Sequence, residues 1–245
     1  MNLDQVLNDP PKPHNEAGQL IVMGLTTDGL RFIRDNADQS SATLETGCGL
    51  STVAFALTGS RHFAISPAGS EFEILKSYCR ERGIATAQID FIESPSETVL
   101  PTLALPPLDL VLIDGRHGFP APYIDWFYTA GRLKKGGHVI VDDVWVWSGQ
   151  ILRDFLAEQP QWEFVAEYEG RTAVFKKLAE GAEWMEWTQQ PLVARGGRLQ
   201  LIDGQPRVVE PQTAPATSAV RRALGDLGRG DFAALGKKVF RRIGG

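Results

Sequence analysis

A glycine-rich turn joins a predicted strand to a predicted helix in the segment LETGCGLST, residues 44–52. Glycine lets the backbone turn sharply and approach a ligand without a Cβ in the way. The start of the following helix presents free N–H groups and the positive end of the helix dipole, which suit an anionic group. Glu45 stands just before the glycines, so the turn can offer a carboxylate to an ammonium group and N–H groups to a carboxylate. This favours a ligand with an amino-acid portion over a dinucleotide, whose pyrophosphate Glu45 would repel. A tight turn without a ligand is the alternative.

Strands and helices alternate along the chain around this turn. Expected strands cover residues 42–45, 62–65, 89–92, 108–113 and 138–141. Expected helices cover residues 27–37, 51–57, 71–82, 122–134 and 149–157. Residues 162–168 and 172–177 flank a short polar turn and predict a β-hairpin. The pattern predicts an α/β fold with a doubly wound, mostly parallel seven-stranded sheet that ends in the antiparallel hairpin. Such sheets bind ligands beyond the carboxyl ends of their strands.

The chain divides into four expected segments. Residues 1–25 are polar and broken by prolines, which predicts an arm or lid outside the core, and residues 26–178 form the α/β domain. Residues 179–215 lose the periodicity and predict an irregular extension. Residues 216–245 predict a basic amphipathic helix, because apolar side chains recur there at intervals of three and four residues.

The net charge of −5 is unevenly distributed. Residues 213–245 hold seven basic and two acidic side chains, whereas the remainder holds 18 basic and 28 acidic ones. No nucleic-acid partner is expected for so acidic a body, because phosphate binding needs concentrated positive charge on the working surface. The basic tail is a candidate for contact with a membrane surface or a partner protein. Docking of the tail on its own domain is the alternative.

Several features indicate a cytoplasmic protein. The chain has no apolar run of the roughly 18 residues needed to span a membrane, and its polar start differs from a secretory signal. Cys48 and Cys79 make neither a disulfide framework nor a zinc cluster, which favours a reducing compartment. The aromatic side chains at residues 126–128 are expected in the core or at the surface between copies of a homo-oligomer, and not in a substrate site.

The pattern Glu45-x-Gly47-x-Gly49 between a strand and a helix resembles motif I of class I S-adenosylmethionine-dependent methyltransferases. Two further segments, LIDGRH at 112–117 and GGHVIVDD at 136–143, resemble the O-methyltransferase-like branch. That branch includes catechol-type enzymes and metal-dependent sugar methyltransferases. The resemblance covers residues 26–177 and implies a Rossmann-like methyltransferase fold. It also implies methyl transfer from S-adenosylmethionine to a hydroxyl of a small-molecule or sugar acceptor.

The resemblance implies a set of cofactor-binding residues near the ends of the first four strands. They are Glu45, Gly47, Cys48, Gly49, Ser51, Thr52, Ser66, Ser96 and Asp114. The chain departs from the family pattern at Ser66 and Pro95, where acidic residues are usual. These departures keep open a catalytically inactive module that only binds S-adenosylmethionine or S-adenosylhomocysteine. A nucleotide-dependent oxidoreductase is a further alternative, which Glu45 argues against.

Three aspartates follow two strands that are expected to be neighbours. Asp114 follows the fourth strand, and Asp142 and Asp143 follow the fifth, so their carboxylates are expected at one edge of the sheet. Oxygen-rich clusters suit Mg²⁺. The metal-dependent relatives place their ligands at these positions, which implies Asp114, Asp142 and Asp143 as ligands of a cation that lowers the pKa of the acceptor hydroxyl. The alternative is that Asp114 caps a loop and one of the pair binds backbone amides.

His117 lies three residues after Asp114 and is the expected general base for the acceptor hydroxyl. Some sugar methyltransferases of the resembling branch place a base histidine at this spacing. A histidine that only orders its loop is the alternative. The expected catalytic residues are therefore His117, Asp114 and Asp143. Trp145 and Trp147 follow in the next loop and are candidates for the wall of an acceptor pocket.

Overall fold

The computed structural model describes residues 1–16, 18–21, 24–181 and 185–209, and the chain divides into two compact units, Met1–Arg195 and Gly196–Gly245. The strands of the first unit are β1 (His14–Glu16), β2 (Gln19–Ile21), β3 (Ala42–Thr46), β4 (Arg61–Ser66), β5 (Ile89–Glu93), β6 (Leu108–Ile113), β7 (Leu133–Val141), β8 (Trp162–Tyr168) and β9 (Thr172–Lys177). The helices are α1 (Leu3–Asn8), α2 (Thr27–Asn36), α3 (Leu50–Thr58), α4 (Gly69–Glu81), α5 (Ser96–Val99), α6 (Ala121–Ala130), α7 (Trp147–Glu158) and α8 (Pro191–Gly196), with a 3-10 turn at Trp187–Gln189.

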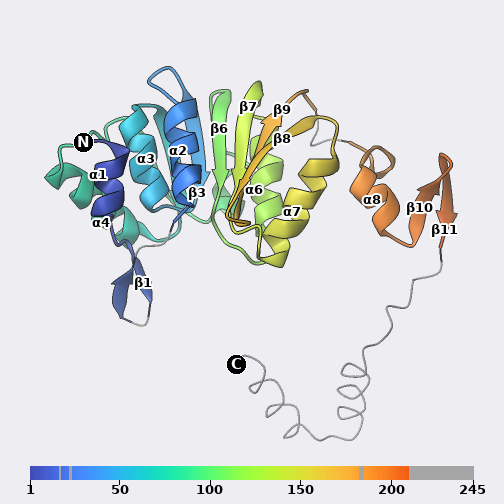
Figure 1. Cartoon of the computed structure of the whole chain (residues 1–245), viewed down its shortest axis with the longest axis horizontal. Coiled ribbons are helices and arrows are strands. Elements are labelled where there is room, and N and C mark those ends of the chain that lie inside the picture. The colour runs from blue at the N-terminus through green and yellow to red at the C-terminus, as the bar shows by residue number, and fades with distance from the viewer. Residues whose placement is uncertain (17, 22–23, 182–184, 210–245) are drawn as a thin grey trace, which may run out of the picture. The chain divides into compact units, whose positions relative to one another are not determined.

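The central sheet has the strand order β5-β4-β3-β6-β7-β9-β8 (Figure 1). Its pairs are parallel from β5 to β7, and β9 runs antiparallel to both β7 and β8. The predicted doubly wound, mostly parallel sheet with a terminal antiparallel hairpin is confirmed. The order reverses between β3 and β6, and ligands of such sheets bind in the crevice at that point.

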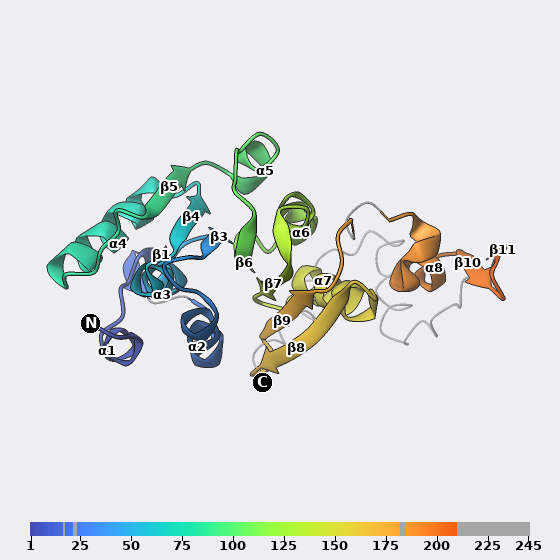
Figure 2. The same ribbon diagram turned by 90° about the horizontal axis from the view of Figure 1, so that it is seen from above.

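Helices cover both faces of the sheet. Figure 2 shows α2 and α3 on one side and α5 and α6 on the other. Buried apolar side chains accordingly form two clusters, one built with Leu30, Val53 and Leu75 and the other with Trp126 and Leu152. The central strand β6 contributes side chains to both clusters. Its almost unbroken apolar sequence thus reflects burial on both faces, as parallel strands require.

The predicted helix at 122–134 is wrong at its end, because α6 stops at Ala130 and the next strand already begins at Leu133. Gly136 and Gly137 resemble a helix stop in the sequence, but they lie inside β7, and Gly136 has φ 88°. The pairing of β6 with β7 shifts register at this level. Glycines inside strands often mark such irregularities. Lys134, expected to close the helix, instead donates from Nζ to Asp109 at 2.7 Å.

The first residues of the chain belong partly to the core, against the expectation of an arm outside it. The short helix α1 is capped by the Asn2 side chain, which accepts from the N–H of Gln5 at 3.0 Å. Leu3 and Val6 on this helix are buried in the cluster that α2 and α3 share. The sequence does not predict this helix, because a helix of one and a half turns leaves little periodicity to detect, and prolines follow it directly.

Regular structure also occurs within residues 179–215, where an irregular extension is expected. It includes α8, which belongs to the first unit except for its last residue, and a hairpin of β10 (Leu199–Ile202) and β11 (Gln205–Val208) in the second unit. Its turn residues Asp203 and Gly204 both have positive φ, which matches the tight two-residue turns of hairpins. The predicted basic helix at 216–245 lies outside the described residues. No helix that the structure describes is long and apolar enough to cross a membrane.

Candidate active site

A pocket of about 340 Å³ lies beyond the carboxyl ends of the central parallel strands. It is lined by His14, Gly24, Gly47, Cys48, Gly49, Ser51, Ile65, Ser66, Pro67, Ala68, Glu71, Pro95, Ser96, Glu97, Asp114, Gly115, Arg116, His117, Asp143 and Arg171. Most of the predicted site residues therefore gather at one place. Glu45, Thr52 and Asp142 do not line the pocket, and neither do Trp145 and Trp147, the candidates for the wall of an acceptor pocket.

Gly47 forms the sharp turn that opens the pocket after β3. Its φ is 90°, a backbone conformation that side chains disfavour, and its N–H donates to the Ile65 carbonyl at 2.8 Å. A Cβ added at this position would lie 2.2 Å from the carbonyl oxygen of Asp114. Glycine is thus required here both by the backbone conformation and by the close approach of the loop after β6.

Replacing Gly47 with alanine is expected to lower the free energy of unfolding by about 3 kcal/mol, because left-handed strain and overpacking add together. Chemical denaturation measures this. Gly83→Ala is the matched control, since Gly83 also has positive φ but a Cβ there meets no atom within 4 Å. We expect a loss of only about 1 kcal/mol for the control. Equal losses in the two variants would show that the contact with Asp114 is unimportant.

The carboxylate of Glu45 is buried and does not line the pocket, although the sequence predicts that it contacts the cofactor. Glu45 is 1% exposed and accepts hydrogen bonds from the hydroxyls of Ser51, at 2.6 Å, and Thr52. Its Oε1 also lies 3.1 Å from Nε2 of His62, which stacks on Phe55. Glu45 therefore holds the start of α3 beneath the glycine turn, and any effect on a ligand passes through these partners.

Thr52 has the same supporting position. Its hydroxyl accepts from the N–H of Gly49 at 2.9 Å and donates to Glu45, so it joins the turn to the buried carboxylate. Ser51 lines the pocket while it donates to Glu45. Of these two candidate cofactor-binding residues, Ser51 is therefore the one placed to meet a ligand.

His14 and Glu71 line the pocket although the sequence analysis does not select them. Nδ1 of His14, on the first hairpin, lies 3.0 Å from Oε1 of Glu71, on the first turn of α4. The Cys48 thiol donates to the other oxygen of Glu71 at 3.3 Å. Burial, reinforced by the charge of Glu45, raises the pKa of Cys48 far above its usual range, so this thiol stays protonated. No sequence signal marks His14, because nothing local shows that the arm folds back to α4.

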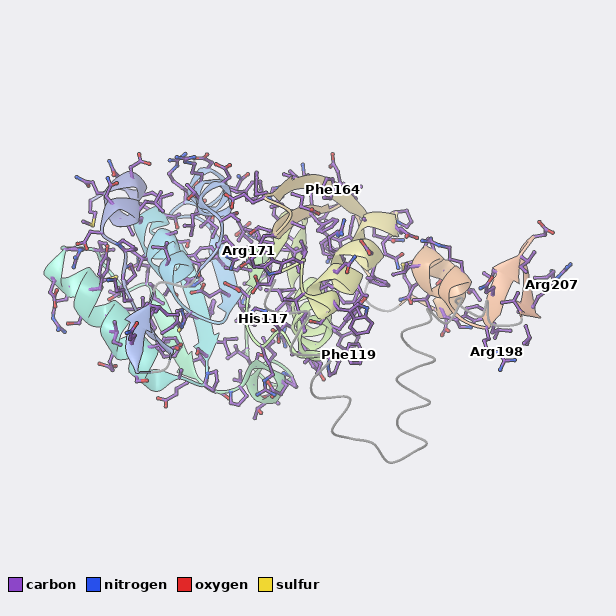
Figure 3. All side chains as sticks on the ribbon, turned by 60° about the horizontal axis from the view of Figure 1, so that its bottom comes forward. His117, Phe119, Phe164, Arg171, Arg198 and Arg207 are labelled. Carbon is purple, nitrogen blue, oxygen red and sulfur yellow. The ribbon has the colours of Figure 1, made fainter. Side chains whose placement is uncertain are left out.

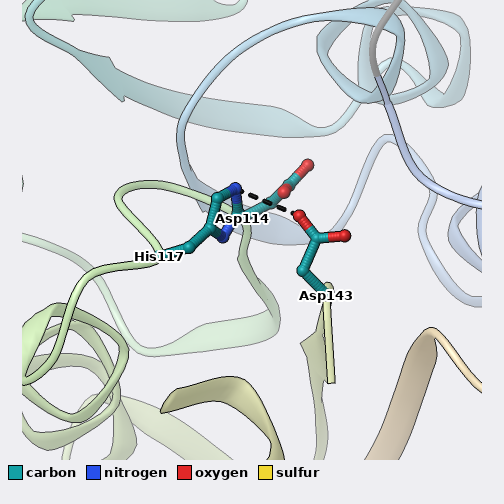
Figure 4. A group of neighbouring side chains, drawn as sticks. All are labelled: Asp114, His117 and Asp143. Carbon is teal, nitrogen blue, oxygen red and sulfur yellow. Dashed lines mark ion pairs between the residues drawn. The ribbon is translucent and has the colours of Figure 1, made fainter. Parts of the chain in front are cut away.

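His117 and Asp143 form the chemical centre of the pocket. Nε2 of His117 lies 3.1 Å from Oδ2 of Asp143, and Figure 4 shows Asp114 beside the pair. The three side chains offer ligand atoms within 4.8 Å of one another. Asp143 has φ 51°, uncommon for a residue other than glycine, and such strained positions concentrate at functional sites. The predicted approach of the loops after β6 and β7 is thus observed.

Arg171 reaches this centre from the turn between β8 and β9 (Figure 3). Its Nε donates to Oδ1 of Asp143 at 3.0 Å, and its Nη2 donates to Oδ2 of Asp142 at 2.9 Å. The other oxygen of Asp142 accepts from the Thr172 hydroxyl. The sequence analysis missed Arg171. The available signal was its place at the tip of the predicted hairpin, beside the end of the strand that carries the two aspartates.

The predicted set of three aspartate ligands does not fit a divalent cation. Asp142 is outside the group that Asp114, His117 and Asp143 form, and its oxygens are bound by Arg171 and Thr172. The same guanidinium binds Asp143. A cation at these carboxylates would therefore face a positive charge already bonded to two of its three predicted ligands.

The pKa values of Asp114, Asp142 and Arg171 are shifted from their usual values. Burial, with the charges of Asp142 and Asp143, raises the pKa of Asp114 well above its usual range. Burial also raises the pKa of Asp142, against the opposing effects of the Thr172 hydrogen bond and the Arg171 charge. Burial opposes the charge of Arg171, but the charges of Asp142 and Asp143 outweigh it and raise the pKa of Arg171. Arg171 therefore remains a cation, and Asp114 favours its neutral form more than an exposed aspartate does.

Three large aromatic side chains stand exposed near His117 and Asp143: two lie on the loops that carry these residues, and the third, Trp147, begins α7. Phe119, Trp145 and Trp147 are 64%, 66% and 62% exposed, respectively. The rings of Phe119 and Trp147 lie with their centroids 5.8 Å apart, and the Trp145 indole N–H donates to Asp143 at 2.8 Å. Exposed apolar side chains that gather in this way often mark binding surfaces.

Comparison with protein families matches residues 44–144 to the model of a methyltransferase domain. The match begins at β3 and ends just after the two aspartates that follow β7, so it includes the glycine turn, Asp114 and His117. Comparison with curated proteins gives no match.

Solved structures, two of them of O-methyltransferases, share the fold. The O-methyltransferase TomG from Streptomyces achromogenes, involved in tomaymycin synthesis and determined with S-adenosylmethionine, has a TM-score of 0.56 at 19% identity over 72% of this chain and 91% of its own. The O-methyltransferase NovP has a TM-score of 0.56 at 12% identity over 72% and 95%. Cofactor-bound Rv0187 from MTB has a TM-score of 0.54 at 19% identity over 63% and 82%. At these identities the likeness concerns the fold alone.

Proposed function

We propose that this chain, in which residues 44–144 match a methyltransferase domain, transfers the methyl group of S-adenosylmethionine to a hydroxyl oxygen of a small-molecule or sugar acceptor. The observation that carries the proposal is the pair of His117 and Asp143 in the pocket that the glycine turn lines. A hydroxyl acceptor must lose its proton as its oxygen gains the methyl group. An imidazole held by a carboxylate is suited to take that proton.

The chain's own part in the reaction is to hold the acceptor and move one proton. S-adenosylmethionine, when bound, supplies a methyl group that is already reactive. Because Nε2 of His117 faces Asp143, it carries the hydrogen in the neutral tautomer, and Nδ1 is the atom that accepts the hydroxyl proton. Asp143 then stabilises the imidazolium. Further acceleration comes from holding the acceptor oxygen in line with the methyl group. The proposed proton transfer uses His117 and Asp143, and it needs no metal ion.

The exposed aromatic side chains support an acceptor with an apolar face. Phe119 follows His117 by two residues, and Trp145 follows Asp143 by two. The Ser148 hydroxyl donates to the His117 carbonyl and so ties these two loops together. An aromatic ring, or the apolar face of a sugar ring, would lie against such side chains while its hydroxyl meets His117.

Replacing both Trp145 and Trp147 with alanine is expected to raise KM for the acceptor by about tenfold, because stacking on one ring contributes roughly 1 kcal/mol. Affinity for S-adenosylhomocysteine should not change. Phe164→Ala is the control, since Phe164 is also exposed and aromatic but lies on β8, whereas Trp145 and Trp147 closely follow Asp143 in the chain. Steady-state kinetics with the acceptor found by screening decides the matter. An unchanged KM in the double variant would remove these tryptophans from the acceptor site.

Two experiments test the proposal. The first is calorimetric titration with S-adenosylhomocysteine. The second is a screen of phenols, catechols and sugars for acceptors that cause release of S-adenosylhomocysteine from S-adenosylmethionine. Micromolar binding and turnover with a hydroxyl acceptor are the expected results. Absence of binding by the parent protein would contradict the proposal.

A catalytically inactive binding module is the second candidate, and Ser66 and Pro95 favour it. Both line the pocket at positions where acidic residues are usual in the resembling family. This candidate predicts binding of S-adenosylhomocysteine without turnover of any acceptor. It also predicts that His117→Ala and the parent protein bind S-adenosylhomocysteine alike and are equally inactive.

A further inference from the structure

Arg171 links two consecutive aspartates through a planar, two-pronged contact. Its Nε and Nη2 atoms donate to Asp143 and Asp142 at 3.0 and 2.9 Å. The Asp142 side chain is fully buried and the Asp143 side chain is 13% exposed, whereas that of Arg171 retains 26% exposure at the pocket. Guanidinium groups suit such paired contacts, because their donors have a fixed geometry that matches carboxylates.

The surrounding backbone fixes this arrangement. Pairing of β7 with β9 places Val141 opposite Ala173, so the residues just before Ala173 lie beside the aspartates that follow Val141. The N–H of Val144 donates to the Arg171 carbonyl at 2.9 Å. The guanidinium also lies 5.4 Å from the centroid of the Trp145 ring, a cation–π distance. Arg171 is therefore held by its main chain as well as by its side chain.

The oxygens of Asp143 are already in use. Oδ1 accepts from Arg171 and from the Trp145 indole, and Oδ2 faces His117. Mg²⁺ demands near-octahedral coordination by oxygens at about 2.0–2.1 Å. An ion bound at Asp143 would compete with Arg171 and with the His117 contact for these oxygens, or take His117 as a ligand, and would lie near the guanidinium charge.

We propose that Arg171 supplies the positive charge that a divalent cation would bring to these aspartates, and that it positions Asp143 against His117, so that the site works without a bound metal ion. Arg171 is a positioning residue in this scheme, because it acts on the acceptor through Asp143 and His117. The role in positioning rests on the proposed function. The exclusion of a divalent cation is a property of the free protein and is measured without cofactor or acceptor.

The test is binding of Mn²⁺, a paramagnetic substitute for Mg²⁺, followed by the electron paramagnetic resonance signal of the free ion. The full-length parent protein should leave this signal nearly unchanged. Arg171→Met removes the charge while keeping side-chain length, and it should bind Mn²⁺ at least about tenfold more tightly, since an unneutralised carboxylate pair attracts a cation. Arg171→Lys retains a charge and should resemble the parent. If Arg171→Met does not fold, Arg171→Gln takes its place.

Two further variants locate the effect. Arg153→Met is the matched control, because Arg153 also contacts two carboxylates, those of Asp154 and Glu167, but does not line the pocket. It should not gain Mn²⁺ affinity. Adding Asp143→Asn to Arg171→Met should abolish the gained affinity.

Two outcomes would overturn the inference: tight Mn²⁺ binding by the parent, or a folded Arg171→Met protein that gains no affinity. S-adenosylhomocysteine binding is measured on the same samples. Its absence, combined with the expected Mn²⁺ pattern, would contradict the proposed methyl transfer but leave the exclusion of the cation standing.

Discussion

His117→Ala is expected to lower kcat for methyl transfer by about 10²–10⁴-fold, the usual contribution of a positioned general base. The reason is that the acceptor hydroxyl then loses its proton to water rather than to an imidazole fixed by Asp143 at 3.1 Å. Affinity for S-adenosylhomocysteine should remain within about twofold, because the base meets the acceptor and not the turn that receives the donor. Steady-state kinetics and calorimetry on the same preparation separate the two quantities.

His138→Gln is the control for this variant. His138 lies on β7, makes an edge contact with Phe32 and does not line the pocket. Its kcat should equal that of the parent. Retention of kcat within about threefold by His117→Ala would assign the histidine a loop-ordering role, since the loss of a true base costs far more.

Glu45→Ala is expected to cost about 3–5 kcal/mol of unfolding free energy, the range found when one partner of a buried charged network is removed. The substitution leaves the hydroxyls of Ser51 and Thr52 and the ring of His62 without their common acceptor inside the core. Urea denaturation at constant pH measures the loss. Glu73→Ala, an exposed carboxylate on α4 that pairs only with Lys76 among the described residues, should leave the unfolding free energy unchanged.

Glu45→Gln distinguishes support of the turn from direct contact with a ligand. The amide keeps the shape and one acceptor oxygen, so much of the network survives. S-adenosylhomocysteine should then bind within about threefold of the parent at a temperature where the variant is folded, because no cofactor contact is lost. A loss of affinity of about a hundredfold in a folded Glu45→Gln protein would restore the direct contact that the sequence suggests.

The order of elements could be predicted because its signals are local. The bounds predicted for the apolar strand at 108–113 and for the hairpin strands at 162–168 and 172–177 agree with β6, β8 and β9. Apolar runs and turn residues predict secondary structure from a few neighbouring positions, so the prediction does not depend on distant parts of the chain. The helix expected at 122–134 failed where the signal was ambiguous, because glycine marks helix ends and strand irregularities alike.

The buried position of Glu45 also bears on the alternative of a nucleotide-dependent oxidoreductase, which the sequence disfavours. That expectation relied on repulsion between Glu45 and a pyrophosphate, but the Glu45 carboxylate is buried and does not line the pocket. The match of residues 44–144 to a methyltransferase domain now carries that distinction.

The sequence by itself determines a parallel α/β sheet and a glycine turn after β3. It also determines that Asp114, His117 and Asp143 lie at the edge where β6 and β7 end. Those features follow from periodicity and from the rule that parallel strands end together. Only the tertiary structure decided that Glu45 turns inward, that Arg171 binds Asp142 and Asp143, and that His14 meets Glu71. The physical reason is that Arg171 and His14 meet partners far away in the chain, and that Glu45 also meets His62 of the neighbouring strand β4. Strand register and packing select such partners, and no local pattern encodes them.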